Sequence, residues 1–251
     1  MKPIRRPLGN RRHALFGAIV LLAVTASSEA AADGGPGPLG ATIQARSGLD
    51  NSRVGPLFGS AGLDGGHFCT ASVVHSKNGN LIVTAAHCLS KGTLWFAPGY
   101  RNGKAPHGVW KVVKTFVPDT WNGDQDENSD VGFAALESKD GVNLEDIVGG
   151  NRFATGRSTG ATAVTVTGYP SNEENAITCT NKPTSHSHTQ QRIECPDFTG
   201  GTSGSPWVNN DGEIVGILGG HEQGGSTSDV SYSIVLKKEA SDLYRKASEQ
   251  S

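Results

Sequence analysis

Three short segments carry residue types that can act together as a nucleophilic catalyst. Residues 84–88 read TAAHC, residues 130–134 read DVGFA and residues 201–206 read GTSGSP. A serine hydroxyl is a poor nucleophile until a histidine takes its proton, and a carboxylate can hold that histidine in the required tautomer. The order histidine, aspartate, serine therefore suggests covalent chemistry on acyl groups. Each segment alone would be a weak indication, because small-residue turns and histidines beside apolar residues are common.

Together the segments resemble those of the secreted trypsin/chymotrypsin-like serine proteases, and the resemblance covers essentially all of the sequence after residue 32. TAAHC matches the family's histidine motif residue by residue, and HFC at 67–69 with ASVV at 71–74 matches the strand before it. The segment 130–136 is similar to the family's aspartate followed by a small and apolar strand. The resemblance implies that His87 is the general base and that Asp130 orients it.

In the serine segment, the resemblance places the nucleophile at Ser203 and not at Ser205. The surrounding glycines allow a tight turn, in which the N–H groups of Gly201 and Ser203 can point at a developing oxyanion. Thr202 stands where zymogen-activated members carry an aspartate that pairs with a new N-terminal ammonium, and the family's Ile-Val-Gly-Gly type of start is missing. The serine motif is similar to that of the bacterial glutamyl endopeptidase branch. We therefore expect an oxyanion hole that forms without an N-terminal salt bridge.

The expected substrate-binding residues give conflicting indications of specificity. Asp197 lies six residues before Ser203, where trypsin-like enzymes carry the acid at the base of the S1 pocket, and this favours Arg or Lys at P1. Asp197 could equally be a structural acid, and Phe198 could cover the pocket floor. Leu218 stands where glutamyl endopeptidases place a pocket histidine, which argues against glutamate. A small, apolar or acidic P1 residue remains an alternative.

Gly219 and Gly220 match the family's strand that pairs with the substrate backbone. His221 follows them at a position where glycine is usual. Three interpretations of His221 stay open: it narrows the pocket, contacts an acidic group, or lies at the edge of a loop.

No metal or organic cofactor is expected. The stretch 124–130 begins like an EF-hand, but Ser129 occupies the position of the required glycine and Ala135 that of the bidentate glutamate. His186 and His188 offer two nitrogens without a third ligand, which is a poor zinc site.

The elements that must position these residues are predicted to be short strands. Apolar or alternating runs separated by turn residues lie at 71–74, 81–83, 109–117 and 131–136, and again at 163–167, 213–218 and 232–236. The pattern lapses between about 146 and 160. A last segment with apolar residues at helical spacing, from Leu236 to Ala247, predicts an amphipathic helix packed on the second half.

The resulting expectation is an all-β fold with two antiparallel six-stranded barrels of the chymotrypsin type and a C-terminal α-helix. The predicted divisions are a signal peptide at 1–32, a flexible leader or propeptide at 33–53, the first barrel at 54–150, and the second barrel with the helix at 151–251. The active site would lie between the barrels.

The N-terminus predicts export. Basic residues precede an uncharged apolar run of 13 residues, 14–26, and small residues follow it. That run is shorter than the roughly 20 residues needed to span a bilayer. The whole chain has 22 Lys plus Arg and 24 Asp plus Glu. Removal of residues 1–32 takes away five basic residues and Glu29. The remaining chain then has 17 basic and 23 acidic residues, a formal charge of −6. This charge argues against nucleic-acid binding.

Four cysteines in an exported chain predict two disulfides. Three pairings are possible. We favour Cys69 with Cys88 and Cys179 with Cys195, because each bridge closes a short loop within one half of the chain.

The predicted function is that of a secreted serine endopeptidase that cleaves protein or peptide substrates through a Ser-His-Asp triad and an acyl-enzyme. It would act as a monomer, without nucleic acid and without a membrane once the signal is removed. The alternative from another class is a catalytically silent binding or adhesion protein with the same double-barrel fold. A serine esterase of the α/β-hydrolase type is disfavoured, because position 205 is a serine and the order of the three residues is reversed.

Overall fold

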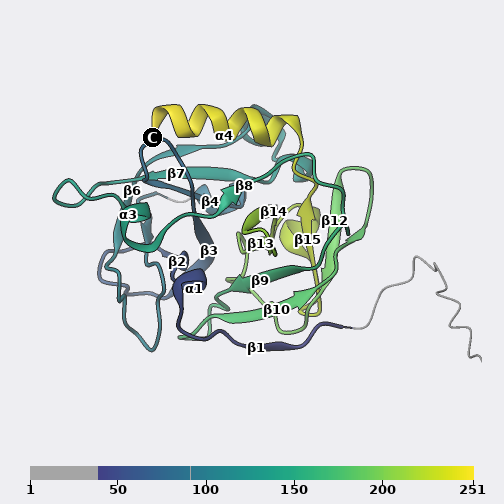
Figure 1. Ribbon diagram of the computed structural model, residues 1–251, viewed down its shortest axis with the longest axis horizontal. Coiled ribbons are helices and arrows are strands. Elements are labelled where there is room, and N and C mark those ends of the chain that lie inside the picture. The colour runs from purple at the N-terminus through teal and green to yellow at the C-terminus, as the bar shows by residue number, and fades with distance from the viewer. Residues whose placement is uncertain (1–38, 91) are drawn as a thin grey trace, which may run out of the picture. The chain divides into compact units, whose positions relative to one another are not determined.

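The structure, a computed structural model, describes residues 39–90 and 92–251 (Figure 1). The predicted signal peptide and residues 33–38 lie outside the described residues. Within these described residues, strands make up most of the secondary structure, and the one long helix comes last. The all-β class with a C-terminal helix is confirmed. Among the described residues, no helix is long and apolar enough to cross a membrane.

Six strands close into a barrel in the order β2-β3-β4-β7-β6-β5. Its pairs are all antiparallel, and the pairing of β2 with β5 completes the ring. Every residue of β2, β4 and β7 is buried, because one face fills the barrel and the other is covered by neighbouring elements. The bounds are β2 (Val54–Phe58), β3 (His67–Val74), β4 (Leu81–Thr84), β5 (Trp95–Phe96), β6 (Trp110–Phe116) and β7 (Gly132–Leu136).

The second half contains two sheets in place of one closed ring. One has six strands in the order β1-β10-β9-β13-β14-β8, and the other has the order β11-β12-β15. The ladder is interrupted between β14 and β15, where Ile217 N donates to the Ser233 hydroxyl (2.9 Å) instead of to a carbonyl. The bounds are β8 (Arg152–Phe153), β9 (Val164–Gly168), β10 (Ile177–Asn181), β11 (Thr184–Ser185), β12 (Gln190–Glu194), β13 (Pro206–Asn209), β14 (Glu213–Ile217) and β15 (Val230–Ile234). The division of the chain at residue 150 stays a prediction.

Part of the expected flexible leader is ordered. Strand β1 (Thr42–Gln44) pairs antiparallel with β10, and the short helix α1 (Leu49–Ser52) follows it. The free edge of β10 supplies the hydrogen-bond partners for β1. The Thr42 hydroxyl also donates to Pro196 O (2.6 Å). Regular structure therefore begins before Val54 and not near it as expected, while the division of the chain at residue 53, as a flexible leader or propeptide, stays a prediction.

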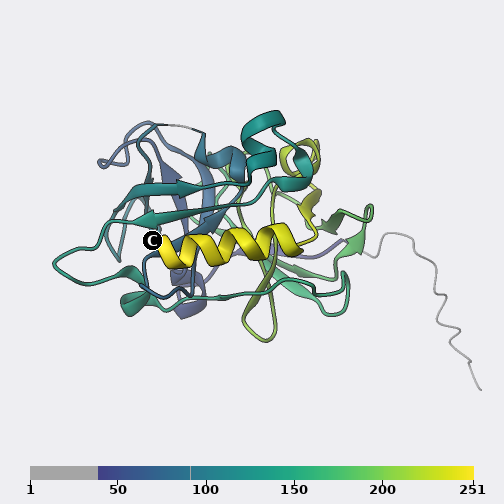
Figure 2. The ribbon, with the colours of Figure 1, turned by 90° about the horizontal axis from the view of Figure 1, so that it is seen from above.

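The terminal helix α4 (Lys238–Gln250) packs on β7 of the first barrel and also contacts β8, where packing on the second half alone was expected (Figures 1 and 2). Its buried residues Ala240, Leu243 and Ala247 join a core cluster that contains residues of both halves. The Tyr244 ring lies 5.7 Å from the ring of Phe133 on β7, measured between centroids. The predicted helix is confirmed, but helical spacing defines only an apolar face and does not identify the surface that covers it.

Short helices occupy several connections. They are η1 (Ala86–Leu89), α2 (Asp119–Asp124), η2 (Glu127–Ser129), α3 (Leu144–Val148) and η3 (His221–Gly224). Both expected disulfides are present, with Cα atoms 6.1 Å apart for Cys69–Cys88 and 6.0 Å apart for Cys179–Cys195.

Candidate active site

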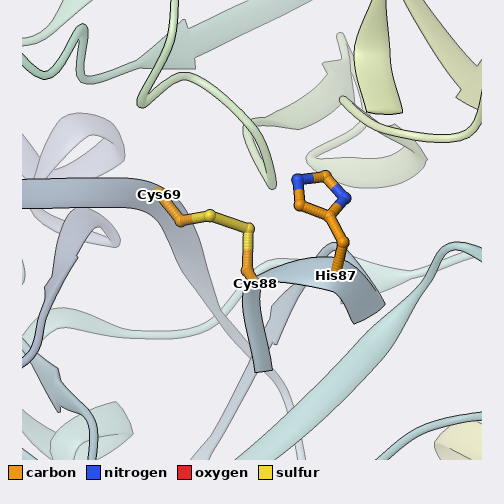
Figure 3. A group of neighbouring side chains, drawn as sticks. All are labelled: Cys69, His87 and Cys88. Atoms are coloured by element: carbon orange, nitrogen blue, oxygen red, sulfur yellow. A yellow bond between two sulfur atoms is a disulfide. The ribbon is translucent and has the colours of Figure 1, made fainter. Parts of the chain in front are cut away.

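His87 lies on η1, directly after β4. The disulfide from Cys88 to Cys69 ties this turn to β3, and Figure 3 shows the imidazole of His87 beside this disulfide. The Thr84 hydroxyl donates to Thr70 O (2.7 Å) and fastens the end of β4 to β3 as well. The backbone that carries His87 is therefore held on both sides of the residue.

The donor atoms of Cys69, His87 and Cys88 lie within 4.8 Å of one another, a spacing that could suit a metal ion. The two sulfur atoms are bonded to each other, so neither is a thiolate that could act as a ligand. His87 Nδ1 is occupied by Asp130. This cluster therefore does not fit a metal, and no other cluster of three such groups is found among the described residues.

Asp130 is buried, with 1% of its surface exposed, and accepts three hydrogen bonds. Its donors are His87 Nδ1 (2.8 Å), His87 N (3.0 Å) and Gly220 N (2.8 Å). These contacts offset the cost of burying a carboxylate. Because a carboxylate only accepts, Nδ1 carries the proton and the lone pair of the ring lies on Nε2. The arrangement can therefore take a proton at Nε2 and stabilise the cation that results.

Ser203 lies in a turn that only glycines can build. Gly201 and Gly204 have φ angles of +99° and +86°, and a Cβ at Gly204 would lie 2.1 Å from Thr70 O. Thr70 N donates to Ser203 O (2.7 Å), which holds this turn against β3, the strand that carries Cys69. Within the described part of the chain, the Ser203 hydroxyl and the N–H groups of Gly201 and Ser203 take part in no hydrogen bond. These groups are free to meet a reacting carbonyl.

Ser205 has a different role from Ser203. Its side chain is fully buried, and its hydroxyl donates to Thr202 O (2.6 Å) inside the same turn. The hydroxyl is therefore engaged in the structure of the turn.

A cavity of about 370 Å³ opens beside Ser203. Phe198 and Leu218 form its apolar wall. The remaining lining residues are small or polar and are Thr199, Gly200, Thr202, Gln223, Gly224, Gly225, Ser226, Thr227 and Ser228. In the part of the chain that the structure describes, no charged side chain lines it.

The structure does not bring Asp197 into this cavity. Asp197 is exposed, its backbone is left-handed with φ at 70°, and it is not a lining residue. Phe198 N donates to Ser228 O (3.0 Å), which turns the Phe198 side chain into the pocket wall. The expectation that Asp197 forms the base of the pocket is therefore not supported.

Gly219 and Gly220 lie beside the His87–Asp130 pair. Gly220 N donates to Asp130, and Gly219 N donates to Tyr232 O (2.9 Å). His221 contacts an acidic group, one of the three interpretations left open: its Nδ1 lies 3.7 Å from Glu127 Oε2. It does not line the cavity beside Ser203.

His186 packs against two other rings of the second half. Its ring stacks against His221, with centroids 4.8 Å apart and a tilt of 31°, and meets Tyr232 edge-on at 4.9 Å. Imidazoles that face each other in this way do not aim their lone pairs at a common ion.

Two residues near the site were not found from the sequence. The Trp121 ring lies 6.5 Å from the His87 ring, measured between centroids, and Trp121 is buried on α2. The Gln190 amide donates to Glu127 O (3.0 Å) and Asn128 Oδ1 (3.2 Å), and its oxygen accepts from His221 N (3.4 Å). Neither residue belongs to a recognisable motif, so the sequence carries no local signal for them.

Comparison with known proteins identifies the family of this chain. The model of the trypsin-like peptidase domain matches residues 69–217, more than half of the chain. The chain therefore belongs to the trypsin-like peptidase family, and it is a serine endopeptidase. A comparison with curated protein sequences finds no similar sequence.

Several solved structures are similar to this chain. The protease Anisep from Arthrobacter nicotinovorans is 25% identical with a TM-score of 0.71, over 83% of this chain and 100% of its own. The thermostable serine protease AL20 from an extremophilic microorganism is 27% identical with a TM-score of 0.71, over 81% and 100%. A Glu endopeptidase shares the fold at 17% identity, with a TM-score of 0.68 over 86% and 99%.

Proposed function

We propose that this protein is a secreted serine endopeptidase that cleaves peptide bonds through His87, Asp130 and Ser203 and accepts an uncharged side chain at P1. The observation that carries the proposal is the buried Asp130, which fixes the proton of His87 on Nδ1 beside the Ser203 turn. The predicted N-terminal signal and the two disulfides support export.

In the proposed reaction, Ser203 Oγ attacks the substrate carbonyl and its proton passes to His87 Nε2. The backbone N–H groups of Gly201 and Ser203 stabilise the oxyanion, and removal of one such donor typically costs about 10²–10³ in rate. His87 then protonates the leaving amine, which leaves an acyl group on Ser203. A water molecule, deprotonated by His87, hydrolyses that ester and restores the enzyme.

The cavity beside Ser203 supports an uncharged P1 residue. A Lys or Arg side chain would lose water there without meeting a carboxylate, and a Glu side chain would meet no cation. The burial of an unpaired charge is strongly unfavourable. Apolar and neutral polar side chains carry no such cost, and both kinds of partner line the cavity.

A panel of fluorogenic peptides that differ only at P1 tests the proposal. Peptides with neutral P1 residues should be cleaved with higher kcat/KM than those with Arg, Lys or Glu. Cleavage should be lost in His87→Ala and retained in His188→Ala, a matched control because His188 is exposed. Turnover that survives His87→Ala would overturn the triad, and a preference for a charged P1 residue would overturn the specificity. No turnover of any peptide would favour the silent binding protein.

A further inference from the structure

A second cavity, also of about 370 Å³, lies apart from the cavity beside Ser203 and shares no lining residue with it. Two segments enclose it, residues 46–52 around α1 and residues 99–107. The buried residues Tyr169 and Ala176 give it an apolar floor. Its volume falls within the roughly 300–1,000 Å³ typical of small-molecule sites and exceeds that of a bare inorganic anion.

Among the described residues, the ionisable side chains that line this cavity with charge are all basic. Arg46, Arg101, Lys104 and His107 line it, and within the described part of the chain no Asp or Glu does. This concentration of positive charge contrasts with the formal charge of −2 of the whole chain.

The acidic groups nearest in sequence to this lining have partners that do not line the cavity, although a Cβ at Gly103 would lie 3.8 Å from Glu174 Oε2. Asp50 Oδ1 lies 3.4 Å from an Arg53 nitrogen. Glu174 accepts a hydrogen bond from the Tyr100 hydroxyl. Burial, with the contact to Glu174, raises the pKa of Tyr100 to about 12, so this hydroxyl keeps its proton and goes on donating.

A hairpin fixes the backbone of two of the basic residues. Arg101 and Lys104 exchange backbone hydrogen bonds of 2.9 Å in each direction across Asn102 and Gly103, whose φ angles of 49° and 72° are those of a tight two-residue turn. The Arg101 guanidinium donates to Ala45 O and to Asn175 Oδ1. The Arg101 guanidinium is thus positioned before any ligand arrives, which lowers the entropic cost of binding at this group.

Two of the cations have no protein partner. Among the described residues, the side chains of Arg46 and Lys104 form no hydrogen bond and no ion pair. An anion placed between them and Arg101 would relieve the repulsion of these like charges and gain charge-assisted hydrogen bonds. We propose that this cavity binds an organic phosphate or sulfate monoester, with the charged group on the basic residues and the organic part over Tyr169 and Ala176.

Calorimetric titration of the full chain with phenyl phosphate, phenyl sulfate, inorganic phosphate and phenol tests the proposal. We expect saturable binding of at least one ester, tighter than that of inorganic phosphate or phenol. Arg46→Gln/Lys104→Gln should weaken it by at least about tenfold, because each loses a charge-assisted contact. Comparison of the two esters decides which oxyanion the site prefers.

The matched control is Lys182→Gln/Lys246→Gln, which removes the same charge from exposed positions outside this cavity. Its affinity should stay at the wild-type value, and thermal unfolding should show both variants folded. The proposal is overturned if neither ester binds saturably, if inorganic phosphate binds as tightly as the esters, or if both double variants weaken binding equally. Binding is measured directly, so none of these results bears on the peptidase proposal.

Discussion

At the scale of single residues, Asp130 connects the two halves of the protein. Its carboxylate accepts from His87 at the end of β4 and from Gly220 beyond β14, so one buried side chain orients the imidazole and also fixes the segment beside it. An amide at this position would preserve the shape but present a donor to Nδ1. The histidine would then adopt the other tautomer, with its proton on the nitrogen that has to accept one.

Asp130→Asn should therefore lower kcat by about 10⁴-fold, the loss that the same exchange causes in a Ser-His-Asp triad. Steady-state cleavage of a good peptide substrate measures this effect. Asp124→Asn is the control, because Asp124 is exposed and forms no ion pair with a described residue. An Asp130→Asn variant with nearly full kcat would rule out that Asp130 sets the tautomer of His87.

His67 is a buried histidine with no part in the proposed reaction. Its Nε2 donates to Glu173 O (3.0 Å), its Nδ1 has no partner among the described residues, and Phe58, Tyr100 and Tyr169 surround the ring edge-on. Burial lowers its pKa below the ordinary 6.5, although the Glu173 carbonyl and the nearby Glu174 charge oppose the shift.

The shift makes the folded state less stable in acid. Below pH 6.5 the unfolded chain binds a proton at this histidine while the folded chain does not. The free energy of unfolding therefore decreases as the pH is lowered from 6.5 to the pKa of His67 in the folded state. Urea unfolding between pH 5 and 7 should show a steeper dependence for the wild type than for His67→Phe, by at most about 1.4 kcal/mol per pH unit. Parallel curves for the two proteins would contradict the account of His67.

At the scale of elements, the loop that carries Asp130 is supported from the second half. Gln190 on β12 is buried, and its amide reaches η2 through Glu127 and Asn128 and the start of η3 through His221. Asp130 directly follows η2. The strand β12 therefore helps to set the position of the carboxylate.

Gln190→Ala should lower kcat/KM by about ten- to hundredfold, because small displacements of catalytic groups are costly. Gln191→Ala is a close control: Gln191 is equally buried, but its amide donates to Val215 O and Ile234 O, away from η2. Each variant should lose about 1–3 kcal/mol of stability, since buried partners are left unsatisfied. Activities are compared well below both melting temperatures. Equal activity in the two variants would refute the supporting role of Gln190.

At the scale of the whole molecule, the serine turn is closed by its own residues. The Thr202 hydroxyl donates to Thr199 O (2.7 Å), and Ser205 N donates to Thr202 O (3.0 Å). In zymogen-activated relatives an aspartate at the position of Thr202 binds an N-terminal ammonium. Here the side chain at this position instead donates to a carbonyl three residues earlier, Thr199 O.

Residues added to the N-terminus of the active enzyme should therefore leave kcat/KM unchanged. Peptide cleavage by two preparations, with and without four extra residues before β1, provides the measurement. Titration of the active sites in each preparation corrects for inactive protein. A large loss of activity on extension would show that a free terminus is needed.

The sequence predicted those features that depend on short motifs or on a local period. The histidine and serine segments, both disulfides, the all-β class and the helical period of α4 are features of this kind. It did not predict that α4 covers β7, because an amphipathic pattern defines a face and not its partner. The same limit applies to β1, whose partner β10 lies more than 130 residues further along the chain.

The position of Asp197 shows a further limit. Asp197 lies six residues before Ser203, yet its backbone is left-handed, its side chain is exposed and it does not line the cavity. The distance in sequence from Ser203 does not determine the backbone conformation of Asp197 or the direction of its side chain.

Labelling with a fluorophosphonate, followed by mass spectrometry of the intact chain and its peptides, tests the central claim most directly. We expect one adduct per chain, located at Ser203, absent from Ser203→Ala and retained in the folded fraction of Ser205→Ala. Ser205→Ala serves as the control two residues away, where the hydroxyl is buried in the turn. An adduct that persists in Ser203→Ala would contradict the assignment of Ser203 as the nucleophile.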